Sequence, residues 1–196
     1  MQNPASTPFG DDQSLETDDN PLRLLGTIDD AINGVFERYR GKRGPDKVAA
    51  LVSILSDYGL IWVVVALTKG LRGGPHRWRA IRNLATAGIL SWGINKLAKK
   101  LVGRSRPEES LRLEVTSDLP VRNPTSSSFP SGHTLAAFCA GAMMADSPAE
   151  TAIFTTFALA VSASRVHLRD HHPSDVIGGA VIGLAVGVMG KKLLRR

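Results

Sequence analysis

The sequence contains a single cysteine, Cys139, among its 196 residues. One cysteine cannot form an intramolecular disulfide, and a cysteine-rich metal site is excluded. Aromatic residues are also scarce, at 6%, although the chain carries a formal net charge of +6. Its cations cluster at the ends of apolar runs, a placement that suits phosphate substrates and anionic lipid head groups better than nucleic acid. We therefore expect membrane lipids as partners and no nucleic-acid partner.

A secretory signal pattern is missing as well. Residues 1–20 lack the basic stretch and apolar run that open a signal peptide, so a secreted soluble enzyme is not expected. The same residues are polar and acidic, which predicts a disordered acidic tail over residues 1–20. No internal repeat of long period is present.

Residues 21–40 predict an amphipathic helix. Its apolar positions are Leu25, Ile28, Ile32, Val35, Phe36 and Tyr39, and its acidic positions are Asp29, Asp30 and Glu37. Apolar side chains at helical spacing opposite charged ones form one apolar face. That face fits two placements, along the membrane surface or packed on a helical bundle. We assign residues 21–40 as an interfacial helix.

From residue 48 onward, apolar runs nearly free of charge alternate with polar connections. This pattern predicts an all-α integral membrane bundle of about five spans within residues 48–196. The expected spans cover residues 48–68, 80–102, 134–146, 149–166 and 176–189. Asp57 interrupts the first span. An intramembrane carboxylate is either functional or paired with a basic neighbour that positions helices, and we favour the pairing.

The densest cluster of ionisable residues lies between the last two runs, from Ser164 to Asp175. Pro173 can open the following helix, because a proline in the first turn loses no hydrogen bond. Asp175 follows His171 by four residues, so its carboxylate can accept a proton from one imidazole nitrogen. That contact fixes the tautomer and leaves the other nitrogen as a nucleophile. A helix cap with solvated neighbours explains the same residues equally well.

Two further segments carry candidate phosphate-binding groups. Ser131 and Gly132 precede an apolar run and offer a hydroxyl and backbone N–H groups at a helix N-terminus, which suits an oxyanion. His133 adjoins them as a possible proton donor. Lys99 and Arg106 lie seven residues apart, two helical turns, so we expect both on one face of a helix that ends at Pro107. A basic membrane-proximal end is the alternative interpretation.

Taken together, the three segments resemble the signature of the type 2 phosphatidic acid phosphatase (PAP2) superfamily. The matching residues are Lys99-x6-Arg106-Pro107, Pro130-Ser131-Gly132-His133 and Ser164-Arg165-x5-His171-x3-Asp175. Every signature position is matched in order. The predicted spans also bring the segments to one rim, because the second span ends where the third begins and the fourth returns there.

The resemblance implies the same roles that the residue types suggest. His171 attacks phosphorus and forms a phosphohistidine intermediate, Asp175 orients it, and His133 protonates the leaving oxygen and then activates water. No metal or other cofactor is expected, because fixed cations and donors can stabilise the transferring phosphoryl group. The expected phosphate-binding residues are Lys99, Arg106, Ser131, Gly132 and Arg165.

Several lipid phosphates remain open as substrates. The family implies phosphatidic acid, phosphatidylglycerol phosphate or polyprenyl pyrophosphate. The Ala-, Gly-, Arg- and Val-rich composition indicates a high-GC bacterium, which adds decaprenylphosphoryl-5-phosphoribose. We expect a multi-pass protein of the bacterial plasma membrane, and the resemblance favours an active site on the outer face, although basic residues are nearly balanced between the two faces. The alternative functions are a vanadium haloperoxidase-like enzyme and a non-catalytic protein that binds lipid head groups.

Overall fold

The computed structural model describes residues 21–108, 112, 121 and 125–195. The predicted acidic tail of residues 1–20 lies outside the described residues. The described part is helical and contains no strand, so the all-α prediction is confirmed. Its elements are α1 (Pro21–Glu37), α2 (Arg43–Ser56), the 3-10 turn η1 (Asp57–Gly59), α3 (Leu60–Gly70), α4 (Gly74–Val102), α6 (Gly132–Met144), α7 (Pro148–His167) and α8 (Pro173–Leu194).

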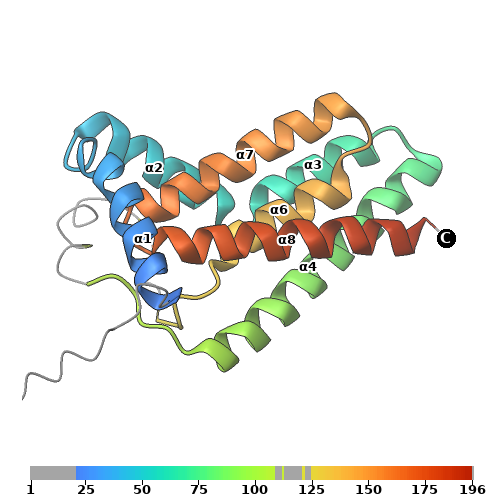
Figure 1. Cartoon of the computed structure of the whole chain (residues 1–196). Helices are drawn as coiled ribbons and strands as arrows, with labels where there is room; N and C mark the ends of the chain where they lie inside the picture. The colour runs from blue at the N-terminus through green and yellow to red at the C-terminus, as the bar shows by residue number, and fades with distance from the viewer. Residues whose placement is uncertain (1–20, 109–111, 113–120, 122–124, 196) are drawn as a thin grey trace, which may run out of the picture.

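Helix α6 lies at the centre of the bundle, where α4, α7 and α8 pack around it (Figure 1). It is only 13 residues long and is rich in small and apolar side chains. Leu135, Cys139 and Met143 are fully buried on it. A central helix covered on several sides needs an apolar surface nearly all round, and α6 has one. The Ser131–His133 segment lies at its N-terminal end, so the core of the fold holds one of the three signature segments in place.

Helix α8 packs against α6 through a ridge of glycines, Gly179, Gly183 and Gly187. A Cβ atom at Gly179 would lie 2.8 Å from the backbone oxygen of Ser131, and one at Gly187 would lie 2.6 Å from that of Cys139. The missing side chains let the two backbones approach closely, as small residues do between membrane helices. The contact therefore depends on glycine at every fourth position of α8.

The structure corrects two expected boundaries. The predicted first span is not continuous: it breaks at η1, and α2 and α3 meet at an angle of 59°. Helix α2 ends at Ser56 because Asp57 takes an extended backbone with ψ 138°, and Gly59 adopts the left-handed backbone with φ 69° that precedes α3. The expected loop of residues 69–79 is also shorter, because α4 begins at Gly74 and takes Pro75 into its first turn, where proline is tolerated.

By length and apolar composition, one helix in the described part could cross a membrane by itself, α8. The bent pair of α2 and α3 passes the same test if it is counted as one span. Helix α6 is too short for the test, and α4 carries cations at both ends. The count of five spans and the interfacial placement of α1 remain predictions.

We expect the substitution Gly187→Ala to destabilise the bundle. The added methyl group would meet the backbone of α6, which cannot move aside as a flexible side chain can. Overpacking of this kind costs about 1–3 kcal/mol. Thermal unfolding in detergent measures the loss. Gly88→Ala is the matched control, because a Cβ atom there meets nothing within 4 Å and alanine favours a helix. Equal melting temperatures for the two variants would contradict the close-packed ridge.

Candidate active site

The three signature segments meet at one end of the bundle. The backbone N–H of Ser131, at the start of α6, donates to the backbone oxygen of Asp175 in the first turn of α8, at 3.1 Å. Arg106, in the loop after α4, places Nη1 3.4 Å from Nε2 of His171. Hydrogen bonds and close contacts therefore join segments that lie far apart in the sequence.

His171 lies in the short loop between α7 and α8, and its side chain is buried. Its Nε2 faces Arg106, and its Nδ1 lies 3.8 Å from Oδ2 of Asp175, which is longer than a hydrogen bond. Burial lowers the pKa of His171 to about 4, and the positive charges of Arg106 and Arg165 add to the shift. The imidazole is therefore neutral at pH 7, the form that can attack an electrophile.

The carboxylate of Asp175 is held by several hydrogen bonds. It is fully buried, and it accepts from Arg104 at 2.7 Å, from the backbone N–H of His172 at 2.8 Å, and from the hydroxyl of Ser128. These bonds keep the carboxylate charged and hold it beside His171. Neither Arg104 nor Ser128 occupies a signature position, so no motif in the sequence points to these two residues.

Helix α1 contributes to the same network. Asp29 accepts from Arg104 at 2.8 Å, and also from the backbone N–H and the hydroxyl of Ser174, at 2.7 and 2.8 Å. Its carboxylate therefore binds the positive N-terminal end of α8 as well as the arginine that holds Asp175. Helix α1, predicted as amphipathic, thus supports the loop that carries His171, although α1 contains none of the three signature segments.

The structure revises how Lys99 and Arg106 come together. They do not share a helix, because α4 ends at Val102 and Gly103 takes a left-handed conformation with φ 61° as its cap. Both cations instead reach the same loop: Nζ of Lys99 donates to Ser127 O at 2.5 Å, and Nε of Arg106 donates to Ser126 O at 2.7 Å. Glycine capping at residue 103, rather than Pro107, sets the end of the helix.

Arg165 is buried at the end of α7 and forms an ion pair with Asp170. Asp170 also accepts from Arg112 at 2.7 Å, and Arg165 donates to the hydroxyl of Ser53 at 2.5 Å. One donor of Arg165, Nε, is buried without a hydrogen-bond partner in the described part of the chain. A buried unbonded donor on a guanidinium is a group that a phosphate oxygen can satisfy.

His133 has a carboxylate partner of its own. Its Nε2 lies 2.8 Å from Oδ1 of Asp57, in the turn where α2 gives way to α3. The favoured interpretation of Asp57 was a pairing with a basic neighbour, and the structure pairs it with the candidate proton donor. The charge of Arg165 acts on both His133 and His171, so the two imidazoles share one electrostatic environment.

Gly132 has a packing role that its sequence position did not reveal. A Cβ atom at this residue would lie 3.0 Å from Nδ2 of Asn95, so the absence of a side chain lets Asn95 of α4 lie against the start of α6. Oδ1 of Asn95 is buried without a hydrogen-bond partner in the described part of the chain. Ser131 is fully buried beside it and accepts from Thr134 at 3.1 Å.

Comparisons with known proteins identify the family. The profile of the PAP2 superfamily matches residues 80–195, more than half of the chain. The chain belongs to the PAP2 superfamily. The match spans all three signature segments, so the predicted resemblance is confirmed, and with it the class of enzyme, a PAP2-type phosphoric ester hydrolase.

Curated relatives of this PAP2 chain include two bacterial phosphatases. A decaprenylphosphoryl-5-phosphoribose phosphatase from Mycobacterium tuberculosis is 29% identical over 141 residues, which cover 70% of this chain and 74% of the relative. A lipid A 1-phosphatase from Rhizobium etli is 28% identical over 184 residues, which cover 84% of this chain and 76% of the relative.

Two solved structures share the fold. The transmembrane PAP2-type phosphatidylglycerolphosphate phosphatase from Bacillus subtilis superposes with a TM-score of 0.69 at 23% identity, covering 88% of this chain and 87% of that one. LpxE from Aquifex aeolicus gives a TM-score of 0.57 at 22% identity, covering 87% and 94%.

The low pKa of His171 predicts a pH-dependent stability. Between pH 6.5 and pH 4 the unfolded chain binds a proton at this residue that the folded chain does not, so stability falls as the pH falls through this window. From pH 7 to pH 5 the loss from this one group is up to about 2 kcal/mol. The melting temperature of the variant His171→Gln should therefore change less over this interval than that of the wild type.

His76→Gln provides the control for this measurement, because His76 is exposed in the first turn of α4. Its melting temperature should follow the wild type at both pH values. An unchanged pH response in His171→Gln would show that His171 is not held neutral by burial.

Proposed function

We propose that this PAP2 protein is a metal-independent membrane phosphatase that removes phosphate from a lipid phosphomonoester or pyrophosphate through a phosphohistidine intermediate. The observation that carries the proposal is the placement of His171, with Nε2 beside the guanidinium of Arg106 and Nδ1 beside Asp175. A neutral imidazole between a carboxylate and a cation is arranged as an oriented nucleophile next to a binding group for the phosphoryl oxygens.

Two cations of the site retain their charge for the substrate. Among the described residues, Lys99 and Arg106 form hydrogen bonds to neutral oxygens and no ion pair with a carboxylate, whereas Arg104 and Arg165 are paired with aspartates. An incoming phosphate dianion therefore meets two cations that form no ion pair with a described carboxylate, and the unbonded Nε of Arg165. This distribution supports the predicted binding roles of the three residues.

The reaction proceeds in two transfers. In the first, Nε2 of His171 attacks phosphorus, the bond from phosphorus to the ester oxygen breaks, and His133 gives its proton to that oxygen. As its Nε2 becomes bonded to phosphorus, the imidazole is positively charged, and Asp175 stabilises that charge. In the second transfer, His133 takes a proton from a water molecule, and the oxygen of that water attacks phosphorus. The bond from phosphorus to Nε2 of His171 then breaks, which releases inorganic phosphate.

The substrate is a lipid whose head group reaches this rim while its chains stay among the helices. The curated relatives act on decaprenylphosphoryl-5-phosphoribose and on the 1-phosphate of lipid A. We propose decaprenylphosphoryl-5-phosphoribose as the first substrate to test, in line with the high-GC composition, and an active site on the outer face of the bacterial plasma membrane. Phosphate release from a panel of lipid phosphates in detergent tests both the proposed class of enzyme and the choice of substrate.

The nucleophile is tested by His171→Ala, which should lower phosphate release at least about 10³-fold, because no other group can form the covalent intermediate. Asp175→Asn should lower the activity of the folded protein about 10²- to 10⁴-fold, because the imidazole loses its charged partner. His76→Ala should keep wild-type activity. Chelators should have no effect, and vanadate, which mimics five-coordinate phosphorus, should inhibit.

Turnover retained by His171→Ala would remove the covalent mechanism. Binding of lipid phosphates by wild type without phosphate release would favour the non-catalytic head-group protein. Bromide oxidation after vanadate loading would instead favour the haloperoxidase-like enzyme.

Asp57 is proposed to hold His133 in position for proton transfer. Asp57→Asn should lower kcat/KM about tenfold or more for an alkyl phosphate, since positioned general acids contribute about 10²- to 10⁴-fold. The loss should be much smaller for nitrophenyl phosphate, whose leaving group needs little protonation. Asp46→Asn is the matched control, because Asp46 pairs with His167 at 2.7 Å in another aspartate–histidine pair, which lies outside the site. Equal losses on both substrates would assign Asp57 a purely structural role.

A further inference from the structure

The end of the bundle away from the active site carries two adjoining cavities. The first is an apolar groove of about 420 Å³ between α6, α7 and α8. The second is a basic cup of about 550 Å³ lined by Arg79 and Arg82 of α4 together with Arg195 after α8. Lys191 and Arg195 line both, so the groove and the cup lie side by side.

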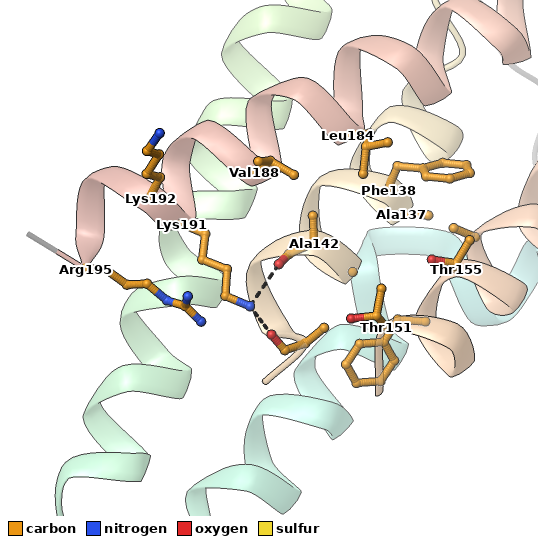
Figure 2. A pocket seen from close by; sticks show the side chains of 14 residues that line it. Ala137, Phe138, Ala142, Thr151, Thr155, Leu184, Val188, Lys191, Lys192 and Arg195 are labelled. Carbon is orange, nitrogen blue, oxygen red and sulfur yellow. Dashed lines mark hydrogen bonds between the residues drawn. The ribbon is translucent and has the colours of Figure 1, made fainter. Parts of the chain in front are cut away.

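Figure 2 shows the groove with its cationic and apolar parts separated. Lys191, Lys192 and Arg195 gather at one end, while Phe138 and Leu184 lie at the other. Lys191 donates to the backbone oxygens of Ala142, at 3.3 Å, and of Ala145. It therefore caps the C-terminal end of α6 and holds the shared wall of the two cavities in place.

The cup has more positive charge than its carboxylates balance. Among the described residues, none of Arg79, Arg82 and Arg195 forms an ion pair with a carboxylate, and all three are exposed. Asp146 also lines the cup, but its carboxylate binds Lys69 at 2.9 Å. Three unbalanced guanidinium groups on one concave surface attract an anion that carries phosphate.

The position of the cup separates it from the catalytic rim. Helix α8 runs along the bundle (Figure 1) from Asp175 in its first turn to Leu194, which lines the cup, and its 22 residues correspond to about 33 Å at 1.5 Å per residue. A bilayer has a hydrocarbon core of about 30 Å. The cup therefore lies at the level of the lipid head groups on the opposite membrane face.

We propose that this surface binds a phospholipid with an anionic head group, which is distinct from the substrate. The phosphate of the lipid lies in the basic cup, and one acyl chain occupies the apolar groove between α6, α7 and α8. The positive charge of the cup favours an anionic head group, and the apolar groove beside the cup favours a lipid over a soluble anion. The site goes beyond the proposed catalytic function and does not depend on it.

The test is native mass spectrometry of the full-length protein in detergent with phosphatidylglycerol or phosphatidylcholine. Wild type should retain phosphatidylglycerol preferentially. The double variant Arg79→Gln/Arg82→Gln should lose most of this preference, because each basic residue near a lipid surface contributes about a fivefold factor in affinity. Arg77→Gln is the matched control, since Arg77 lies on the same turns of α4 but lines neither cavity. Its preference should equal that of wild type.

Two further variants separate the possible occupants. Thr155→Trp should fill the groove from an exposed position and release the lipid, whereas Thr156→Trp, its exposed neighbour outside the groove, should not. Soluble glycerol phosphate should not displace the lipid, because it lacks the acyl chain. Lys99→Gln should leave the preference intact, since Lys99 belongs to the catalytic end.

Equal retention of the two lipids by wild type would overturn the proposal. A preference for phosphatidylglycerol that survives Arg79→Gln/Arg82→Gln would overturn it as well. These cations would then serve only to orient the protein in the membrane. A preference lost in Lys99→Gln would place the lipid in the active site, and displacement by glycerol phosphate would show a simple anion site.

Discussion

The structure depends on one buried carboxylate, Asp175. Removing a charged group from water is costly unless cations and donors replace the solvent. Here Arg104 comes from the loop after α4, Ser128 from the segment before α6, and the N–H of His172 from the start of α8. Each segment that carries a signature motif must therefore approach Asp175 to neutralise it. The same requirement that stabilises the carboxylate assembles the site around His171.

The basic residues of the site fall into two groups, those that form ion pairs with aspartates and those that do not. Arg104 lies between Asp29 and Asp175, and Asp170 lies between Arg112 and Arg165, so two chains of alternating charge run through the buried end of the bundle. In such chains the charge of each cation is balanced by an aspartate, although Arg165 keeps its Nε donor unbonded among the described residues. Lys99 and Arg106 bond to neutral oxygens instead, which leaves their charge for a substrate. A site that must bind a dianion and release inorganic phosphate needs both kinds of cation.

Much of this arrangement followed from the sequence, because the spacing of the helices brings the three motifs to one rim. The partners that depend on contacts between distant segments did not. Asp29 and Arg104 are 75 residues apart, and Asp57 and His133 are 76 apart, so no periodicity links them. The shared helix expected for Lys99 and Arg106 was wrong because Gly103 caps α4 early. In the sequence, Pro107 was the stronger indication of where the helix ends. The left-handed Gly103 ends α4 before Pro107 is reached.

The glycine ridge connects this local chemistry to the whole bundle. His133 lies in the first turn of α6, and His171 lies just before the first turn of α8. Their relative position therefore follows from how α6 and α8 pack, and that packing is set by backbone contacts at Gly179, Gly183 and Gly187. Side chains can repack around a change of one or two atoms, but two backbones in contact leave little room for such adjustment. The glycines of α8 thus constrain the relative position of His133 and His171, the proposed proton donor and nucleophile.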